Sequence, residues 1–223
     1  MNVAPPRELK TGTIIDDTLG VLERGAVPFV MFIVALALLN SAVGYYGLEY
    51  TSVLQQVLKG VLGFTIGVAA TYFLYEAVLA RTGLRSRQSE DAFLPFIGLA
   101  IVTALGIMLG LVALVIPGLY LIARWSIAAP VLMIEGKGPI KAMQDSWERT
   151  KGSDFSIFVA VLLFFGIPWL ASIAAGVVLG PEDPLGIVLS QLASAVASAL
   201  GVAMAAALYG RMVGGKQEAA VPA

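Results

Sequence analysis

The chain of 223 residues has the composition of a membrane protein: 58% of its residues are hydrophobic and 13% are charged, and its mean hydropathy is +0.87. Soluble domains carry about 25% charged residues, so this composition excludes one or two soluble domains of the same length. The formal net charge of −1 gives no basis for nucleic-acid binding.

The first 26 residues form a polar segment ahead of the first apolar stretch. They contain acidic residues and no apolar core, which is unlike a signal peptide. Within this segment, Ile15, Leu19 and Leu22 fall at i, i+4 and i+7, and Thr13 begins a capping-box pattern. We predict an amphipathic helix over 13–24 in the cytoplasmic membrane surface. The alternative is that the pattern is only the usual amphipathic character of a loop near a bilayer.

Six apolar stretches follow. A spanning helix needs about 20 largely apolar residues, and the stretches lie near 27–47, 57–80, 93–115, 119–134, 155–180 and 185–209. The sequence therefore predicts an all-α polytopic bundle of six transmembrane helices over residues 27–210, followed by a cytoplasmic tail over 211–223.

The basic residues indicate how the chain crosses the membrane. Twelve of the 14 Lys and Arg residues lie in alternate gaps between the stretches, namely Arg7, Lys10, Arg24, Arg81, Arg85, Arg87, Lys137, Lys141, Arg149, Lys151, Arg211 and Lys216. The three other gaps contain no cation, and two of them contain the acidic residues Glu49, Glu182 and Asp183. Because cytoplasmic loops carry an excess of Lys and Arg, we predict a multi-pass protein of the bacterial cytoplasmic (inner) membrane with both termini in the cytoplasm.

A second amphipathic segment lies between the fourth and fifth stretches, at residues 139–150. Pro139 suits the first position of a helix, and Ile140, Met143 and Trp147 form an apolar stripe. We predict a second helix in the cytoplasmic membrane surface, with the same alternative as for the first.

Small residues recur at the spacing that brings spanning helices into close contact. Helices in lipid associate through backbone proximity, and GxxxG and similar patterns permit it. The positions that we expect to pack are Gly63, Gly67, Gly106, Gly110, Ala197 and Gly201. The sixth stretch is so rich in small residues that we place it in the middle of the bundle or at a subunit contact. A pore lining is the alternative for its Ser and Gly residues.

Two sites break the helical pattern. Pro117 and Gly118 mark a turn between the third and fourth stretches, and Pro168 interrupts the fifth, because proline lacks a backbone donor and forces a kink. Kinked spans mark some transporter sites, but proline is also common in spanning helices.

Three ionisable residues are candidates for an intramembrane role: Arg124, Glu76 and Glu135. Arg124 lies six residues from the predicted outer turn, roughly 9 Å deep, and Glu76 lies five residues before Arg81, roughly 7 Å from the inner surface, at 1.5 Å per residue. Arg124 has a structural interpretation, in which it binds backbone carbonyls or a headgroup phosphate. Its functional interpretation is an anion site. Lys59, near the outer end of the second stretch, is expected to extend to the outer headgroups.

No catalytic constellation is present. The chain has no His and no Cys, which removes the commonest general base, the commonest metal ligand and thiolate metal sites. No carboxylate has a visible orienting partner. We predict no catalytic residue, no cofactor and no metal.

The run from Ile116 to Phe158 reads IPGLYLIARWSIAAPVLMIEGKGPIKAMQDSWERTKGSDFSIF. It resembles the signature of the glycerophosphoryl diester phosphodiesterase membrane-domain family and of the YciC-like bacterial inner-membrane proteins. In these families a Pro-Gly turn is followed by an Arg in the next span, a Pro, a Glu, a short helix with Ala and Ser, and a Gly. The corresponding residues here are Pro117, Gly118, Arg124, Pro130, Glu135, Ala142, Ser146 and Gly152.

The resemblance implies a membrane domain and little more. In some relatives this domain is fused to a soluble phosphodiesterase barrel that uses His residues, paired carboxylates and a divalent metal. Because this chain has no His, we do not carry the catalytic activity over to it.

Our first hypothesis is a non-enzymatic inner-membrane protein that acts as a scaffold, an accessory or a complex subunit in envelope or lipid homeostasis. Its partners would be membrane lipids and either another membrane protein or further copies of the chain. The alternative is a transporter or channel for a small or anionic solute, which would use Arg124 and the interrupted fifth helix.

Overall fold

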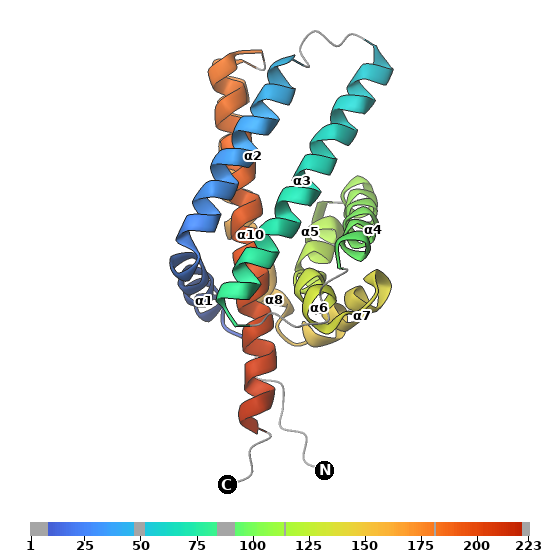
Figure 1. Ribbon diagram of the computed structural model, residues 1–223, viewed down its shortest axis with the longest axis vertical. Helices are drawn as coiled ribbons and strands as arrows, with labels where there is room; N and C mark the ends of the chain where they lie inside the picture. The colour runs from blue at the N-terminus through green and yellow to red at the C-terminus, as the bar shows by residue number, and fades with distance from the viewer. Residues whose placement is uncertain (1–8, 47–51, 84–91, 114, 181, 220–223) are drawn as a thin grey trace.

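The computed structural model describes residues 9–46, 52–83, 92–113, 115–180 and 182–219. These residues form helices and no strand, which confirms the predicted all-α fold (Figure 1). In chain order the elements are α1 (Thr11–Arg24), α2 (Ala26–Tyr46), α3 (Val53–Arg81), α4 (Phe93–Ala113), α5 (Val115–Arg124), α6 (Ala128–Glu135), α7 (Pro139–Arg149), α8 (Asp154–Val161), the π-helical η3 (Leu162–Gly166), α9 (Ile167–Leu179) and α10 (Pro184–Ala219).

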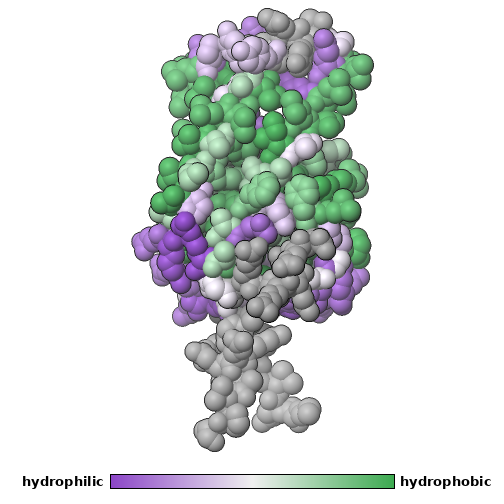
Figure 2. All heavy atoms as spheres, in the orientation of Figure 1, coloured by the Kyte–Doolittle hydropathy of each residue, from purple (hydrophilic) through white to green (hydrophobic). Residues whose placement is uncertain are grey.

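Six segments are long and apolar enough to cross a membrane, as predicted: Ala26–Tyr46, Val53–Arg81, Phe93–Val112, Ile116–Glu135, Asp154–Leu179 and Pro184–Met212. On the face shown in Figure 2, a broad hydrophobic band lies between hydrophilic residues at the two ends. The last helix continues to Ala219, so it includes most of the predicted tail.

The long helices α2, α3 and α10 run along the length of the molecule, and α10 packs against α1, α2, α3 and α9 (Figure 1). The expectation that the sixth span lies in the middle of the bundle agrees with these contacts. Helices α1 and α7 and the C-terminal part of α10 lie at the same end, the lower end in Figure 1. Helices α4 and α5 stop short of the opposite end.

The fourth span is two helices. After Arg124 the chain turns through residues 125–127, where Ser126 N donates to the Ala123 carbonyl at 3.4 Å and Ala128 N to the Trp125 carbonyl at 3.0 Å. Both are i to i+3 bonds, which tighten the backbone and end α5. The predicted break at Pro117 and Gly118 is misplaced, because α4 ends at Ala113 and α5 begins at Val115. Both residues lie in the first turn of α5, where a missing proline N–H is tolerated.

The fifth span is interrupted next to Pro168, where the sequence predicts it. Pro168 has no N–H for the carbonyl of Phe164, and its ring would crowd that carbonyl in a regular α-helix. The five residues before Ile167 widen into the π-helical turn η3, and the helix then continues as α9. Local π-helical adjustments can satisfy the backbone groups that a proline frees in a spanning helix.

The small residues fall into two groups. A Cβ on Gly106 would lie 2.6 Å from the Trp125 ring, and one on Gly201 would lie 2.5 Å from the Phe165 ring. At Gly110 a Cβ would lie 2.9 Å from Gly118 Cα. These three glycines therefore permit close contact.

Gly63 and Gly67 differ from these three. A Cβ on Gly67 would meet no described atom within 4 Å, and one on Gly63 would meet only the Asn40 amide oxygen at 4.0 Å. Ala197 is half-buried on α10.

Both predicted amphipathic helices form, and their place in the membrane surface stays a prediction. Helix α1 begins at Thr11 with Lys10 as its N-cap, so the predicted capping box at Thr13 is wrong. It buries Ile14, Thr18 and Val21 against α8 and α10. The predicted apolar stripe of Ile15, Leu19 and Leu22 lies next to this buried face, and Leu19 is 47% exposed. The apolar pattern alone therefore did not distinguish the face of α1 that contacts protein from the face that remains exposed.

Candidate functional site

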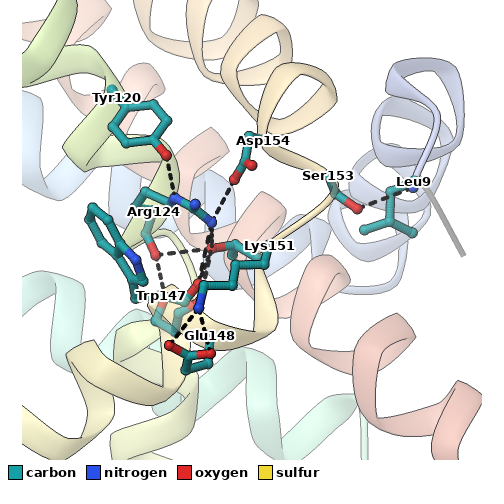
Figure 3. Close-up of polar contacts among 10 residues, drawn as sticks. Leu9, Tyr120, Arg124, Trp147, Glu148, Lys151, Ser153 and Asp154 are labelled. Carbon is teal, nitrogen blue, oxygen red and sulfur yellow. Dashed lines mark hydrogen bonds and ion pairs between the residues drawn. The ribbon is translucent and has the colours of Figure 1, made fainter. Parts of the chain in front are cut away.

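Arg124, the last residue of α5, is buried, and its Nε and Nη1 atoms bind groups of the protein (Figure 3). Its Nε donates to the Tyr120 hydroxyl at 2.8 Å, and its Nη1 donates to the Trp147 carbonyl and the Thr150 hydroxyl, both at 3.3 Å. Nη1 also forms an ion pair with Asp154, 2.6 Å from Oδ1. The guanidinium faces two aromatic rings, 4.8 Å from the Trp147 centroid and 5.2 Å from that of Tyr120, within the range of a cation–π contact.

The backbone of Arg124 is bound as well. The turn after α5 leaves its carbonyl without the usual partner, since Ala128 N donates to the Trp125 carbonyl instead. The hydroxyl of Ser146, on α7, donates to the Arg124 carbonyl at 2.8 Å. Ser146 and Thr150 are fully buried. Arg124 therefore joins the broken fourth span to α7 and to the start of α8.

Arg124 does not lie where residue counting predicts. Counting from the predicted outer turn placed Arg124 roughly 9 Å from that end of the bundle. In the structure it binds the corner between α7 and α8, at the end of the molecule where α7 lies (Figure 1). The reason is that α5 has only 10 residues and that α4 and α5 stop short of the opposite end. The residue count to Arg124 therefore started from a point inside the bundle and not from its end.

Glu135, the last residue of α6, lies in a second polar cluster. Its carboxylate accepts two bonds from Arg149, at 2.5 and 2.8 Å, and one from the Tyr209 hydroxyl at 2.9 Å. Lys137 Nζ is 2.6 Å from Oε2. A paired Arg–carboxylate contact fixes orientation as well as charge, so Glu135 holds α7 and α10 against the end of α6.

Lys137 connects Glu135 to Asp145 on α7. Lys137 and Lys141 both bind Asp145, the latter at 3.1 Å. The hydrogen bond from Lys137 lowers the pKa of Asp145 below its ordinary 3.8, and the same bond raises the pKa of Lys137 above 10.5. The hydrogen bonds to Glu135 raise the pKa of Arg149. This end of the molecule is thus a network of mutually paired charges.

Glu76, the third candidate, lies apart from Arg124. It accepts a hydrogen bond from the Tyr72 hydroxyl, one turn earlier on α3, at 3.3 Å. Tyr72 packs edge-on against Phe93 and Phe96 of α4. Lys59, near the start of α3, donates to the Gly44 carbonyl at 3.4 Å. The structure therefore does not bring the two predicted charged candidates, Arg124 and Glu76, together.

A cavity of about 500 Å³ lies between α3, α4, the α5–α6 turn, η3 and α10. Most of its lining is apolar, and it includes the predicted packing residues Gly67 and Gly201. Phe64 lines it and is also 43% exposed, so the cavity opens onto the outer surface of the bundle. Its volume is in the range of small-ligand pockets.

Sequence reasoning missed the partners of the charged residues. Asp154 was not singled out, although an acidic residue in the first turn of a spanning helix after a Thr-x-Gly run is a visible signal. Ser146 matches a position of the family signature, but neither it nor Thr150 could be recognised as a partner of Arg124, because buried hydroxyls in a polar helix resemble exposed ones in sequence. The sequence does not single out Tyr209 as a partner of Glu135. Across the described part of the chain, no group of three or more His, Cys, Asp or Glu residues is arranged to hold a metal ion.

The comparison with known families agrees with these observations. The family model for the membrane domain of glycerophosphoryl diester phosphodiesterase matches residues 26–181. That range begins at the first residue of α2 and covers five of the six spans, with Arg124 and Glu135 among them. No curated protein and no solved structure matches the chain significantly. Since the match covers well over half of its residues, the chain belongs to the membrane-domain family of glycerophosphoryl diester phosphodiesterase.

Proposed function

We propose that this integral membrane protein is a non-enzymatic scaffold or accessory protein in envelope or lipid homeostasis. We place it in the bacterial cytoplasmic membrane with both termini in the cytoplasm. The basic side chains at the ends of α1, α3 and α7 support this threading, since α1, α7 and the C-terminal part of α10 share one end of the molecule (Figure 1) and cytoplasmic segments are rich in Lys and Arg. Arg7, Arg85 and Arg87 lie outside the described residues.

The observation that carries the proposal is that Arg124 and Glu135 are each bound by other groups of the protein. Arg124 is held by Asp154 and three further groups, and Glu135 by Arg149, Lys137 and Tyr209. A general base or an anion site needs a group whose partner is the substrate. The geometry of Arg124 and Glu135 is that of a structural network, which favours a role in assembly over one in catalysis.

The experiment is isolation of the tagged protein in polymer nanodiscs cut from native membranes, without detergent. A scaffold or subunit should be recovered with a second protein, or a second differently tagged copy, at a fixed stoichiometry. Recovery of single copies accompanied only by lipid would contradict the proposal. Release of an alcohol from a glycerophosphodiester by the purified protein, abolished in Glu135→Gln, would contradict the non-enzymatic part.

A transporter or channel for a small or anionic solute remains the second candidate. The observation that favours it is that two irregular backbone segments, the α5–α6 turn and η3, line the same cavity. Discontinuous spans surround the substrate in several transporter folds. Anion flux into proteoliposomes that is present in the wild type and lost in Arg124→Ala, at equal amounts of folded protein, would support this function. Flux no faster than in protein-free liposomes would exclude it for the anions tested.

A further inference from the structure

The α5–α6 turn and the π-helical turn η3, the two irregular segments of the bundle, both line the cavity described above. Trp125 and Ser126, in the turn between α5 and α6, line it from one side, and Phe165, in η3, lines it from another. Non-helical backbone at membrane depth is tolerated where it is buried in protein or lines a cavity, and π-helical turns are frequent at functional sites. Because two such features line one cavity, we infer that the cavity is a specific feature of the fold.

Gly67 keeps this space open. Gly63 and Gly67 have the spacing of a helix-contact motif, yet a Cβ on Gly67 would meet no described atom within 4 Å. Gly67 nevertheless lines the cavity. Its missing side chain therefore provides volume on the cavity wall, whereas Gly106, Gly110 and Gly201 provide close approach.

The polar groups of the lining are mostly used by their own helices. Thr103 donates to the Leu99 carbonyl at 2.7 Å, and Ser198 to the Ser194 carbonyl at 3.0 Å. The hydroxyl oxygen of Ser126 is buried and has no hydrogen-bond partner among the described residues. A small anion or a hydrated ion would need several free donors. The lining is instead mostly apolar.

We propose that this cavity binds one acyl chain of a membrane amphiphile, with the Ser126 hydroxyl bonded to the polar group at the head of that chain. The proposal rests on the lipid-related function proposed above and names the ligand class. Phe64 connects the cavity to the exposed apolar surface, where the surrounding medium is the hydrocarbon of the bilayer. Ser126 is two residues from Arg124, which is bound at the α7–α8 corner, so the head of the chain belongs to the leaflet on the α7 side.

The experiment compares two identical substitutions on one helix. Gly67→Leu fills the cavity, and Gly60→Leu is the matched control. Gly60 lies seven residues, or about two turns, earlier on nearly the same stripe of α3. A Cβ there also meets no described atom within 4 Å, but Gly60 is exposed and outside the cavity. Both changes improve helix propensity equally, so neither should unfold the protein.

The first readout is the amphiphile retained per chain after purification in mild detergent, by native mass spectrometry. We expect the wild type and Gly60→Leu to retain one amphiphile and Gly67→Leu to retain at least fivefold less. Ser126→Ala should lower retention about two- to tenfold, as expected for one lost hydrogen bond. Equal retention in Gly67→Leu and the wild type, or none in the wild type, would overturn the proposal.

The second readout identifies the source of the chain. Palmitate and palmitoyl lysophosphatidylglycerol are added separately, and the thermal midpoint is measured, since a ligand that binds the folded state raises it. If both probes raise the thermal midpoint, the ligand is the acyl chain alone. If only the lysolipid raises it, the ligand is a phospholipid. An unchanged thermal midpoint with both probes would overturn the proposal. So would a wild-type dimer that Gly67→Leu converts to a monomer while lipid retention is unchanged. A protein partner found without bound lipid would leave the scaffold function standing and refute the lipid site alone.

Discussion

Arg124 Nη1 lies 2.6 Å from Asp154 Oδ1, and this ion pair joins the end of α5 to the first residue of α8. Arg124 is buried, whereas the Asp154 side chain is 36% exposed. The pair closes the corner where the chain leaves the broken fourth span, forms α7 and enters the fifth span. Arg124 also binds α7, so one side chain ties three helices together.

Arg124→Met should destabilise the protein by about 2–4 kcal/mol, because it leaves Asp154 and the Trp147 carbonyl without their partner. Asp154→Asn should cost less, about 1–2 kcal/mol, since its side chain is partly exposed and an amide still accepts a hydrogen bond. Unfolding in detergent monitored by circular dichroism measures both. In the double variant the two losses should be less than additive; full additivity would show that the pair does not interact.

Glu135→Gln should lower the unfolding free energy by about 1–3 kcal/mol, because Arg149 and Lys137 lose their shared carboxylate. The matched control is Glu148→Gln, whose carboxylate pairs with Lys151 on the surface, where both side chains are more than half exposed. Exposed pairs contribute about 0–1 kcal/mol, so the control should change little. Equal losses in the two variants would argue against a structural role for Glu135.

Gly118→Ala should destabilise the protein, whereas Gly67→Ala should not. A Cβ on Gly118 would lie 2.8 Å from the backbone nitrogen of Leu111, which cannot move without shifting α4. Such overpacking costs about 1–3 kcal/mol. At Gly67 there is open space, and replacing a helical glycine by alanine gains up to about 1 kcal/mol. Thermal midpoints that shift in the same direction for both variants would be inconsistent with the two kinds of glycine described here.

Acid should loosen α7 before it unfolds the bundle. The hydrogen bond from Lys137 lowers the pKa of Asp145 below 3.8. The stability from this bond is therefore complete above pH 3.8 and is lost as the pH falls through the lower, folded-state value. Amide hydrogen exchange in α7 should rise below that point in the wild type. In Asp145→Asn, exchange in α7 should be faster than in the wild type above that point, and the acid step should be absent; an unchanged step would assign it to another group.

The sequence predicted the elements of this fold well and their connections less well. Apolar length alone locates the six spans, because the bilayer requires about 20 apolar residues of any spanning helix, and Pro168 marks the π-helical turn. The break after Arg124 has no such mark. It is held by Ser146 on the Arg124 carbonyl, a contact between residues 22 positions apart, and no local pattern reports it.

The candidate site shows the same division. Arg124 and Glu135 stand out because charges in a span are rare, but sequence could not give their partners. Those partners depend on how far α4 and α5 extend across the bundle. Likewise, the GxxxG spacing of Gly63 and Gly67 is identical to that of Gly106 and Gly110, and only the three-dimensional structure separates a contact from a cavity wall.

In the threading that we propose, the end of the molecule with α7 faces the cytoplasm and the α9–α10 end faces outward. The chain has no Cys, so single-cysteine variants can be labelled without background. A membrane-impermeant thiol reagent applied to intact cells, with the outer membrane permeabilised, should label Glu182→Cys and leave Lys151→Cys unlabelled until the cytoplasmic membrane is lysed. Labelling of both from the same side, or of Lys151→Cys alone in intact cells, would contradict the account.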